Sequence, residues 1–313
     1  MSTAPTVVEG PGLRLHLFLP APALAPYITL YYRTEVTSRH LIEDGLPPEW
    51  ANLRFGKGAV YEAAVGSTEF QMVPEAVVAG PTSKLTYLRI ARGDFWGVGL
   101  LPLGFTQFIG LPASDFADRF HDLAEVEGLA EIKAAIASIM AAPADTAGAV
   151  GTLNDLFTRL VEPSARGSDL IVEAHEALLS EDVRSVGELQ SALGLGSRTL
   201  ERFCRRHFGF TPQLLLRRQR FLRSLSRFLV DPSLKWIGSL DSNYHDQAQF
   251  VRDFRAFMGM LPREYARMEH PIAMTALRAR RALLGAPVQV LHRPSAPPPR
   301  RADAAKMGAL AAD

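Results

Sequence analysis

The feature that most constrains the fold of this chain is a segment that occurs twice, 50 residues apart. The first copy covers residues 200–212 and the second covers residues 250–262. Four positions are identical: Arg202 and Arg252, Arg205 and Arg255, Gly209 and Gly259, and Pro212 and Pro262. A glycine just past a helix adopts a positive φ without penalty, and a proline three residues later suits the first turn of the next helix. Each copy therefore predicts a helix that ends at the glycine, and the repeat predicts two copies of one helical module.

A short helix and a turn are predicted before each copy. Ser185 and Glu188 have the spacing of a capping box that opens a helix through Ala192, and Gly194-Leu-Gly196 predicts a tight turn before a helix at Ser197. Before the second copy, residues 236–240 predict a helix, residues 241–245 a turn and residues 246–249 a capped helix start. In that turn Asn243 stands where glycine would be easiest, and asparagine tolerates the left-handed conformation. Two helices joined by a short turn are typical of a helix-turn-helix.

A long helix is predicted to join the two modules. It opens at Thr211-Pro212 and continues to Val230. Its apolar residues are expected to face the core, which leaves a set of arginines for its other faces: Arg217, Arg218, Arg220, Arg223 and Arg227.

Charge divides the chain into two parts. Residues 1–183 hold 23 acidic and 12 basic side chains, whereas residues 184–282 hold 18 basic and 8 acidic ones. The net charge of +1 therefore hides a basic region that suits a polyanionic partner. A solvated basic face would give the same composition, so the residue pattern within this region has to decide.

The first 115 residues predict mainly strands. Leu13, Leu15, Leu17 and Leu19 recur at every second position, and further short apolar runs cover residues 27–36, 73–78, 85–90 and 95–101. Proline and glycine separate these runs. Several short strands with turn signals predict a small antiparallel barrel or sandwich.

After residue 123 the apolar period becomes that of helices. Apolar residues recur every three or four positions over 129–140 and over 150–160, with Pro143 between the two segments. Two such helices either fold back on the strands or pair with a second copy of the chain. Residues 162–168 predict a linker, and the Pro- and Ala-rich residues 285–313 predict a disordered tail.

With these motifs the chain resembles the AraC-type family of transcriptional regulators. The matching residues are Leu200-x-Arg202-Phe203, Gly209-Phe-Thr-Pro212, Arg220, Tyr244-His-Asp-Gln-Ala-Gln-Phe-Val-Arg-Asp-Phe-Arg255 and Gly259-Met-Leu-Pro-Arg-Glu-Tyr265. This resemblance covers residues 168–268, about a third of the chain. Residues 46–48, 80–82 and 101–104 are similar to the cupin-like sensory half of one branch of that family.

The resemblance implies an α+β chain. Residues 1–162 would form a cupin-like antiparallel barrel or sandwich with two following helices, which binds an effector and serves dimerisation. Residues 168–270 would form an all-α DNA-binding domain of two helix-turn-helix units joined by a long helix, followed by the tail 285–313. Four departures from the family pattern, Gly238, Ser239, Asn243 and Leu261, fall in or just after the second unit, whose stability or base contacts are expected to be weaker.

DNA contacts are expected at the start of each recognition helix, because these side chains face base edges in the major groove. In the first unit they are Arg198, Glu201, Arg202 and Arg205, with Leu200, Phe203 and Cys204 facing the core. In the second unit they are Gln247, Gln249, Arg252 and Arg255, with Phe250 and Phe254 buried. Arginine suits guanine, glutamate suits cytosine and glutamine suits adenine. Arg255 and the arginines of the joining helix are assigned to phosphates, and the two recognition helices are expected about 34 Å apart, one turn of DNA.

Signatures of catalysis are missing from the sequence. A metal-binding cupin needs a His-x-His cluster, but His16, His40 and His121 are scattered, and there is no P-loop, Gly-x-Ser-x-Gly or His-Glu-x-x-His pattern. We therefore expect no catalytic residue, no metal and no cofactor. Cys204 is the single cysteine and is expected to be a packed thiol.

The leading interpretation is a sequence-specific DNA-binding regulator that a small-molecule effector controls. The effector pocket is expected among the aromatic residues of the β half, drawn from Tyr31, Trp50, Phe55, Tyr61, Phe95 and Trp96, with none assigned as a contact. Two alternatives are a ligand-independent regulator, whose first half serves dimerisation or polymerase contact, and a cupin-type enzyme with an accessory helical domain. The candidate partners are double-stranded DNA, a small-molecule effector, a second copy in a homodimer, and RNA polymerase. No apolar run is long enough to span a membrane and no secretory signal precedes the strands, so a cytoplasmic protein is expected.

Overall fold

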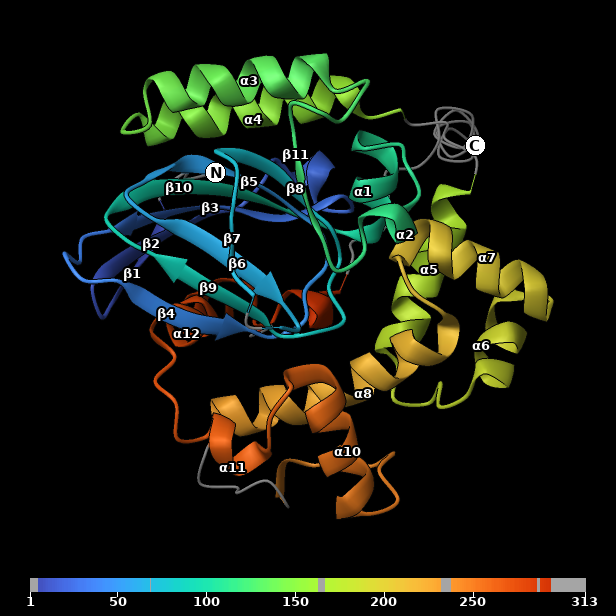
Figure 1. Ribbon diagram of the computed structural model, residues 1–313. Helices are drawn as coiled ribbons and strands as arrows, with labels where there is room; N and C mark the ends of the chain where they lie inside the picture. Colours follow the sequence, from blue (N-terminus) through green and yellow to red (C-terminus); the bar gives the residue numbers. More distant parts are fainter. Residues whose placement is uncertain (1–4, 68, 163–166, 232–237, 286–287, 294–313) are drawn as a thin grey trace, which may run out of the picture.

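Two antiparallel sheets make up the first part of the chain (Figure 1). The computed structural model describes residues 5–67, 69–162, 167–231, 238–285 and 288–293. The larger sheet has the strand order β1-β2-β3-β10-β5-β8-β11 and the smaller sheet has the order β4-β9-β6-β7. The strands are β1 (Thr6–Gly10), β2 (Leu13–Phe18), β3 (Ile28–Val36), β4 (Ile42–Leu46), β5 (Asn52–Gly58), β6 (Tyr61–Val65), β7 (Gln71–Met72), β8 (Ala76–Ala79), β9 (Thr86–Ile90), β10 (Gly93–Leu100) and β11 (Phe120–Asp122).

Alternation in the sequence determines which side of a strand is buried. Leu13, Leu15 and Leu17 in β2 are buried, whereas Arg14 and His16 between them are partly exposed. This is the period of two expected of a strand with one face on the core. The antiparallel sheet-rich first domain that the sequence predicts is confirmed, with more strands than its apolar runs indicate.

Helices α3 (Ala130–Ala141) and α4 (Thr146–Leu160) cover the outer face of the larger sheet (Figure 1). The apolar residues Ile132, Ile136 and Ile139 of α3 are buried, as are Leu153 and Phe157 of α4. The two helices therefore fold back on the strands, and their apolar faces are used within one chain. No side chain of α3 or α4 is among the exposed large hydrophobic residues of the described ranges.

The second part of the chain is entirely helical, as predicted. Its elements are α5 (Ser168–Leu179), α6 (Val186–Leu193), α7 (Ser197–Phe208), α8 (Pro212–Val230), α10 (Gln247–Met258) and α11 (Pro262–Tyr265). In the first part of the chain, α1 (Pro102–Phe108) and α2 (Ala113–Phe116) lie between β10 and β11. Helix α1 is not predicted from the sequence, because Pro102 and Gly104 resemble a loop signal. In the structure Pro102 stands at the first helical turn, where proline is tolerated. Of the helix predicted at 236–240, residues 236 and 237 lie outside the described residues, and residues 238 and 239 are helical.

The chain returns to the β half after the helical part. Helix α12 (Pro271–Leu284) packs on β1, β2 and β4, and Figure 1 shows it, in red, against the strands rather than beside α10. The short helix η3 (Gln289–Leu291) follows, with Gln289 and Val290 buried. The prediction of a disordered tail from residue 285 is therefore wrong for residues 288–291. Val290 belongs to the main core, and Gln219 donates a hydrogen bond to the Val290 carbonyl. Residues 294–313 lie outside the described part, and no described helix is both long and apolar enough to cross a bilayer.

Candidate nucleic-acid interface

The first helix-turn-helix consists of α6, a turn and α7. Ser185 and Glu188 form the predicted capping box, and Gly194 in the turn has a φ of 63°. Leu200, Cys204 and Phe208 face the core, and burial raises the pKa of the Cys204 thiol to about 12, so Cys204 is a packed thiol. Phe203 is partly buried and packs against the core, as predicted, and its ring also contacts the His207 ring.

The opposite face of α7 is exposed and basic. The predicted contacts Arg198, Glu201, Arg202 and Arg205 are all exposed. Arg205 donates to Glu201 at 3.1 Å, one helical turn away, so these two side chains are paired with each other in the free protein. They line an open groove together with Pro112 and Ser114, which belong to the β half.

The second helix-turn-helix presents α10 in the same way. Asp246 caps the helix by accepting from Gln249 N at 2.6 Å, and Gln247, Arg252 and Arg255 are exposed. Gln249 is only partly exposed, because its Oε1 accepts a hydrogen bond from His245 N at 3.3 Å. A side chain that completes the helix cap is less available to read adenine, so of the two glutamines Gln247 is the better placed for base contact.

The repeated positions have the same local geometry in both units. Gly209 has a φ of 86° and Gly259 a φ of 71°, and each stands just after its recognition helix. Pro212 and Pro262 are the first residues of α8 and α11. The repeated arginines 202 and 252 are both exposed. The repeat therefore corresponds to one structural module used twice, whose contacts with DNA stay predictions.

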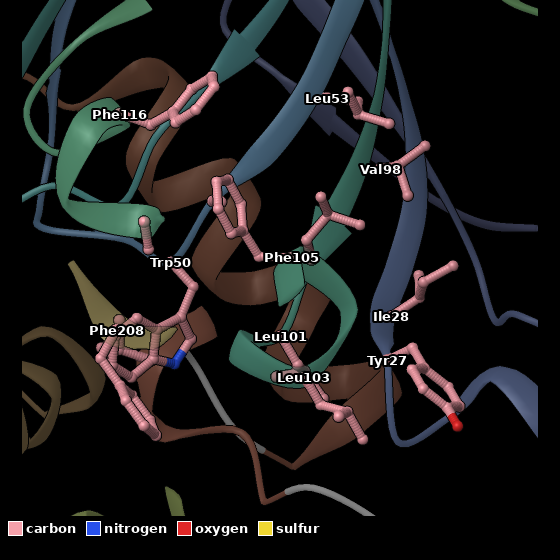
Figure 2. Close-up of a cluster of buried hydrophobic side chains, with 14 of the residues drawn as sticks. Tyr27, Ile28, Trp50, Leu53, Val98, Leu101, Leu103, Phe105, Phe116 and Phe208 are labelled. Atoms are coloured by element: carbon pink, nitrogen blue, oxygen red, sulfur yellow. The ribbon is translucent and has the colours of Figure 1, made fainter. Parts of the chain in front are cut away.

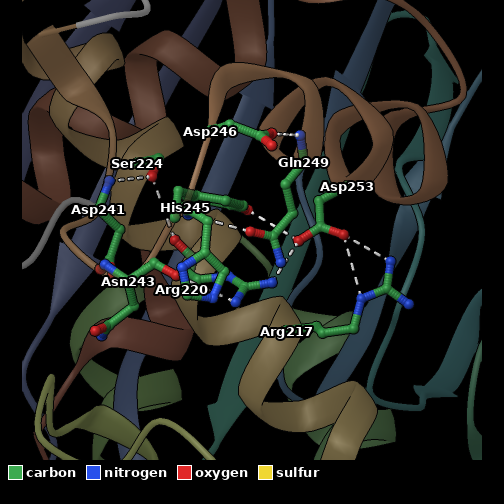
Figure 3. A network of polar contacts seen from close by, with 10 residues as sticks. Arg217, Arg220, Ser224, Asp241, Asn243, His245, Asp246, Gln249 and Asp253 are labelled. Atoms are coloured by element: carbon green, nitrogen blue, oxygen red, sulfur yellow. Dashed lines mark hydrogen bonds and ion pairs between the residues drawn. The ribbon is translucent and has the colours of Figure 1, made fainter.

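Asp253 joins the second recognition helix to α8 through a buried carboxylate (Figure 3). Its side chain is 4% exposed and accepts from Arg217 Nη2 at 2.6 Å, Arg220 Nη2 at 3.0 Å and the Tyr244 hydroxyl at 3.1 Å. Buried charges are tolerated only when paired and hydrogen-bonded. These partners satisfy the carboxylate and fix α10 against α8.

The remaining arginines of α8 also have partners within the chain. Arg223 pairs with Asp241, and Arg227 pairs with Glu181 at 2.7 Å and donates to the Leu240 carbonyl at 3.2 Å. Their ion pairs within the chain therefore favour a structural role over the predicted contacts with phosphates.

Asn243 does not adopt the left-handed conformation that asparagine tolerates at such a turn. Asp118 is the one non-glycine residue with a positive φ in the described part of the chain. Instead, Asn243 Nδ2 donates to the Glu181 carbonyl at 2.9 Å.

A loop of the β half, residues 81–85, contacts three helices of the helical domain: α7, α8 and α10. Pro81 packs against Gly209 at the end of α7, and Arg218 Nη1 of α8 donates to the Thr82 carbonyl at 2.9 Å. Lys84 Nζ and Leu85 N donate to the carbonyls of Ala256 and Phe257 in α10, both at 2.7 Å. Both recognition helices are thereby tied to one loop of the β half.

An aromatic contact supports the same junction. Trp50 stacks edge-to-face on Phe208 with 5.8 Å between ring centroids, and Figure 2 shows the two rings side by side. The Arg218 guanidinium lies 4.0 Å from the Trp50 ring, and burial lowers the pKa of Arg218 to about 9. His175 is also buried against Trp50, and burial lowers its pKa to about 3.

A cavity of about 110 Å³ lies between the two sheets. Four of the six aromatic residues expected at a pocket line it: Phe55, Tyr61, Phe95 and Trp96. Tyr31 and Trp50 do not, because the Tyr31 hydroxyl bonds Asn154 on the outer face of the sheet and Trp50 belongs to the junction. Helix α12 supplies the remaining wall with Ile272, Ala276 and Arg280, which the sequence analysis missed.

Metal ligands do not gather in the structure. No group of three His, Cys, Asp or Glu side chains within the described ranges could hold an ion. His16 lies beside Glu35 at 3.2 Å, and the His121 ring packs on Phe116. These histidines have ordinary packing and hydrogen-bonding roles.

Two family models match the chain. Residues 189–268 match a helix-turn-helix domain, and residues 16–122 match a domain of unknown function, DUF6597. No curated protein sequence matches the chain.

Solved structures with a similar arrangement share little sequence with it. ToxT from Vibrio cholerae bound to (E)-4-(8-methylnaphthalen-1-yl)but-3-enoic acid is 11% identical, with a TM-score of 0.39, over 75% of this chain and 96% of that one. A ligand-free ToxT variant from Vibrio cholerae is 10% identical, with a TM-score of 0.38 and the same coverage. The AraC-like transcriptional activator CuxR is 12% identical, with a TM-score of 0.30, over 68% of this chain and 80% of that one.

Proposed function

Residues 189–268 form a helix-turn-helix domain of the AraC type, and from this premise we propose that the chain is a transcription regulator that reads two successive major-groove segments of duplex DNA. The observation that carries the proposal is the repeated module. Arg202 and Arg252 are exposed at equivalent positions of two recognition helices that end in the same way. Two reading elements on one chain can recognise an asymmetric site without a second copy.

The chemistry of α7 suits guanine-containing DNA. Arg198 and Arg202 have no acidic partner among the described residues and are exposed near the start of the helix, where base edges are reached. Arg205 is held by Glu201, so their ion pair has to rearrange if either reads a base. Exposed pairs of this kind are worth at most about 1 kcal/mol, so a phosphate or base can displace one partner.

On α10 the reading surface is smaller. Gln247 and Arg252 are exposed for base contact, whereas Gln249 completes the helix cap and Asp253 is engaged with α8. We therefore infer that the second unit supplies fewer base contacts than the first. Arg255 is exposed one turn further along α10 and suits a phosphate.

The β half is inferred to hold an effector and to pass its state to the recognition helices. A ligand can bind in the cavity between the sheets. The loop 81–85 puts the β half in direct contact with α7, α8 and α10. Regulation rather than catalysis is the proposed role of this half.

The proposal is tested by selection of full-length protein on random duplex DNA at about 150 mM salt. Enrichment of two short motifs, with centres about 10 base pairs apart, is expected, since one helical turn separates successive major-groove faces. Enrichment of no motif would refute sequence-specific reading, and a single uninterrupted motif within half a turn would refute the use of both units.

A further inference from the structure

An unpaired guanidinium faces the apolar cavity of the β half. Arg280 of α12 is 7% exposed and lines the cavity, and its Nη1 is buried without a hydrogen-bond partner. Arg280 forms no ion pair within the ranges that the structure describes. A buried charge without a partner is energetically costly, so an anion bound beside Arg280 would stabilise it.

The other charges of the cavity leave Arg280 uncompensated. Glu49 is its one carboxylate, and it pairs with Arg54 Nη2. Arg54 Nε also donates to the Tyr32 hydroxyl at 3.1 Å. Two guanidinium groups and one carboxylate line the cavity, which gives it a net charge of +1 among apolar side chains. Burial lowers the pKa of Arg280 by more than the nearby Glu49 and Tyr32 raise it, and Arg54 adds to the lowering.

The apolar lining restricts the body of a ligand. Leucines of β2 and the rings of Phe55, Phe95 and Trp96 surround a space of about 110 Å³. A dry apolar cavity of about 150 Å³ holds benzene, so this smaller space limits the apolar body of a ligand to a short alkyl chain or at most one small ring. Arginine binds carboxylates by paired, charge-assisted hydrogen bonds.

Helix α12 is held so that Arg280 stays at this position. The buried Asp44 carboxylate of β4 accepts hydrogen bonds from Ile272 N and Ala273 N, both at 2.7 Å, and from His270 Nδ1 at 3.2 Å. His270 in turn stacks on Tyr265 at the end of α11, with 4.1 Å between ring centroids. The wall of the cavity is therefore continuous in sequence with the second helix-turn-helix.

We propose that the cavity binds a small organic carboxylate with an apolar body, that Arg280 is its anion-binding residue, and that the bound ligand fastens α12, the helix that follows the second DNA-binding unit. The proposal deepens the effector role inferred above and rests on it. A ligand at this site joins the β half to the end of the helical domain, because its anionic group contacts α12 while its body contacts the sheets.

Direct binding to the full chain tests the proposal. Benzoate and hexanoate are titrated by calorimetry at constant ionic strength, each beside its uncharged amide. At least one carboxylate is expected to bind, and its amide to bind at least about 10-fold more weakly, since a hydrogen bond to a charged group is worth about 1.5–3 kcal/mol. Failure of both carboxylates to bind, or equal binding of the amides, would overturn the proposal.

Variants of α12 identify the residue. Arg280→Leu is expected to weaken carboxylate binding about 10- to 100-fold, whereas Arg280→Lys retains most of it. Arg278→Leu, an exposed arginine of the same helix, is the matched control and leaves binding unchanged. Arg280→Leu also removes an unpaired buried charge, so the ligand-free variant is expected to unfold at the same or a higher temperature. This result separates lost binding from lost folding.

Hydrogen exchange locates the effect. Saturating carboxylate is expected to slow amide exchange over residues 271–284 in the unaltered chain and not in Arg280→Leu. Slower exchange confined to other segments contradicts the role of α12. DNA selection on the same preparations distinguishes the failure of one proposal from the failure of the other. If the chain selects DNA but binds no carboxylate, only the proposed carboxylate site is refuted. If it binds carboxylate but selects no DNA, only the proposed DNA-reading function is refuted.

Discussion

Nη2 of Arg220, in α8, donates a hydrogen bond to Oδ2 of Asp253, in the recognition helix α10, over 3.0 Å (Figure 3). This hydrogen bond helps to fix the angle between α8 and α10, because the Asp253 carboxylate is buried and also accepts from Arg217 and Tyr244. An acidic residue inside a basic DNA-binding unit thus has a structural role.

Asp253→Asn is expected to lower the free energy of unfolding by up to about 3 kcal/mol, since it removes the buried counter-charge that Arg220 and the partly exposed Arg217 share. Glu201→Gln is the matched control, because Glu201 is an exposed acid on the other recognition helix, and it is expected to change stability by less than about 1 kcal/mol. Urea unfolding of the full chain measures both. Equal stability of the two variants would show that the buried network does not hold α10 in place.

Arg202→Ala and Arg252→Ala are each expected to cost about 1–3 kcal/mol of binding free energy on the selected duplex and to relax base preference at different positions. Arg281→Ala, which removes an exposed arginine on the outer face of α12, is expected to leave base preference unchanged. Fluorescence anisotropy with a panel of single-base variants measures the effect. If both recognition-helix variants weaken all sequences equally, the two arginines contact phosphates and not bases.

Gly209→Ala is expected to destabilise the chain more than Gly259→Ala. Both positions require positive φ, which costs alanine about 1–2 kcal/mol. A Cβ on Gly209 would also lie 2.7 Å from Pro81 Cγ, whereas one on Gly259 meets nothing nearer than 3.9 Å. The difference in unfolding free energy, about 1–3 kcal/mol, measures the contact between α7 and loop 81–85. Identical losses would mean that Pro81 yields without cost.

Acidification from pH 7 to pH 5 is expected to destabilise the chain through His175. Burial lowers its folded pKa to about 3, so the folded state keeps the ring neutral while the unfolded state takes up a proton below pH about 6.5. The unfolded state binds more protons, so stability falls as pH falls, by about 2 kcal/mol at pH 5. His175→Phe is expected to reduce this loss, and thermal unfolding at the two pH values measures it. An unchanged pH dependence in His175→Phe would assign the loss to other groups.

Local sequence signals were enough to predict the helical domain. The capping box at Ser185, the glycines after α7 and α10 and the limits of α8 are properties of a few neighbouring residues, and all are found in the structure. The period of two in β2 likewise predicted a strand with one buried face. The exposure of Arg202 and Arg252 follows from helical period alone.

Long-range contacts could not be predicted in the same way. The pairing of Asp253 with Arg217 and Arg220 depends on how α8 crosses α10, so arginines that look free in sequence are engaged. The contact of Arg218 with Trp50 depends on how the two halves dock. Helix α12 did carry a signal, since Pro271, Ile272, Ala276, Ala279 and Gly285 have helical spacing with a start and a stop, but only the fold brings Arg280 into the cavity.

The central claim is that one chain places two recognition helices on one face of DNA, a helical turn apart. The direct test compares the Kd of the full chain for the selected duplex with that for a duplex carrying five extra base pairs between the two motifs. Half a turn rotates one motif to the opposite face, so affinity is expected to fall to that of a duplex with a single motif. Unchanged affinity for the lengthened site would contradict the claim.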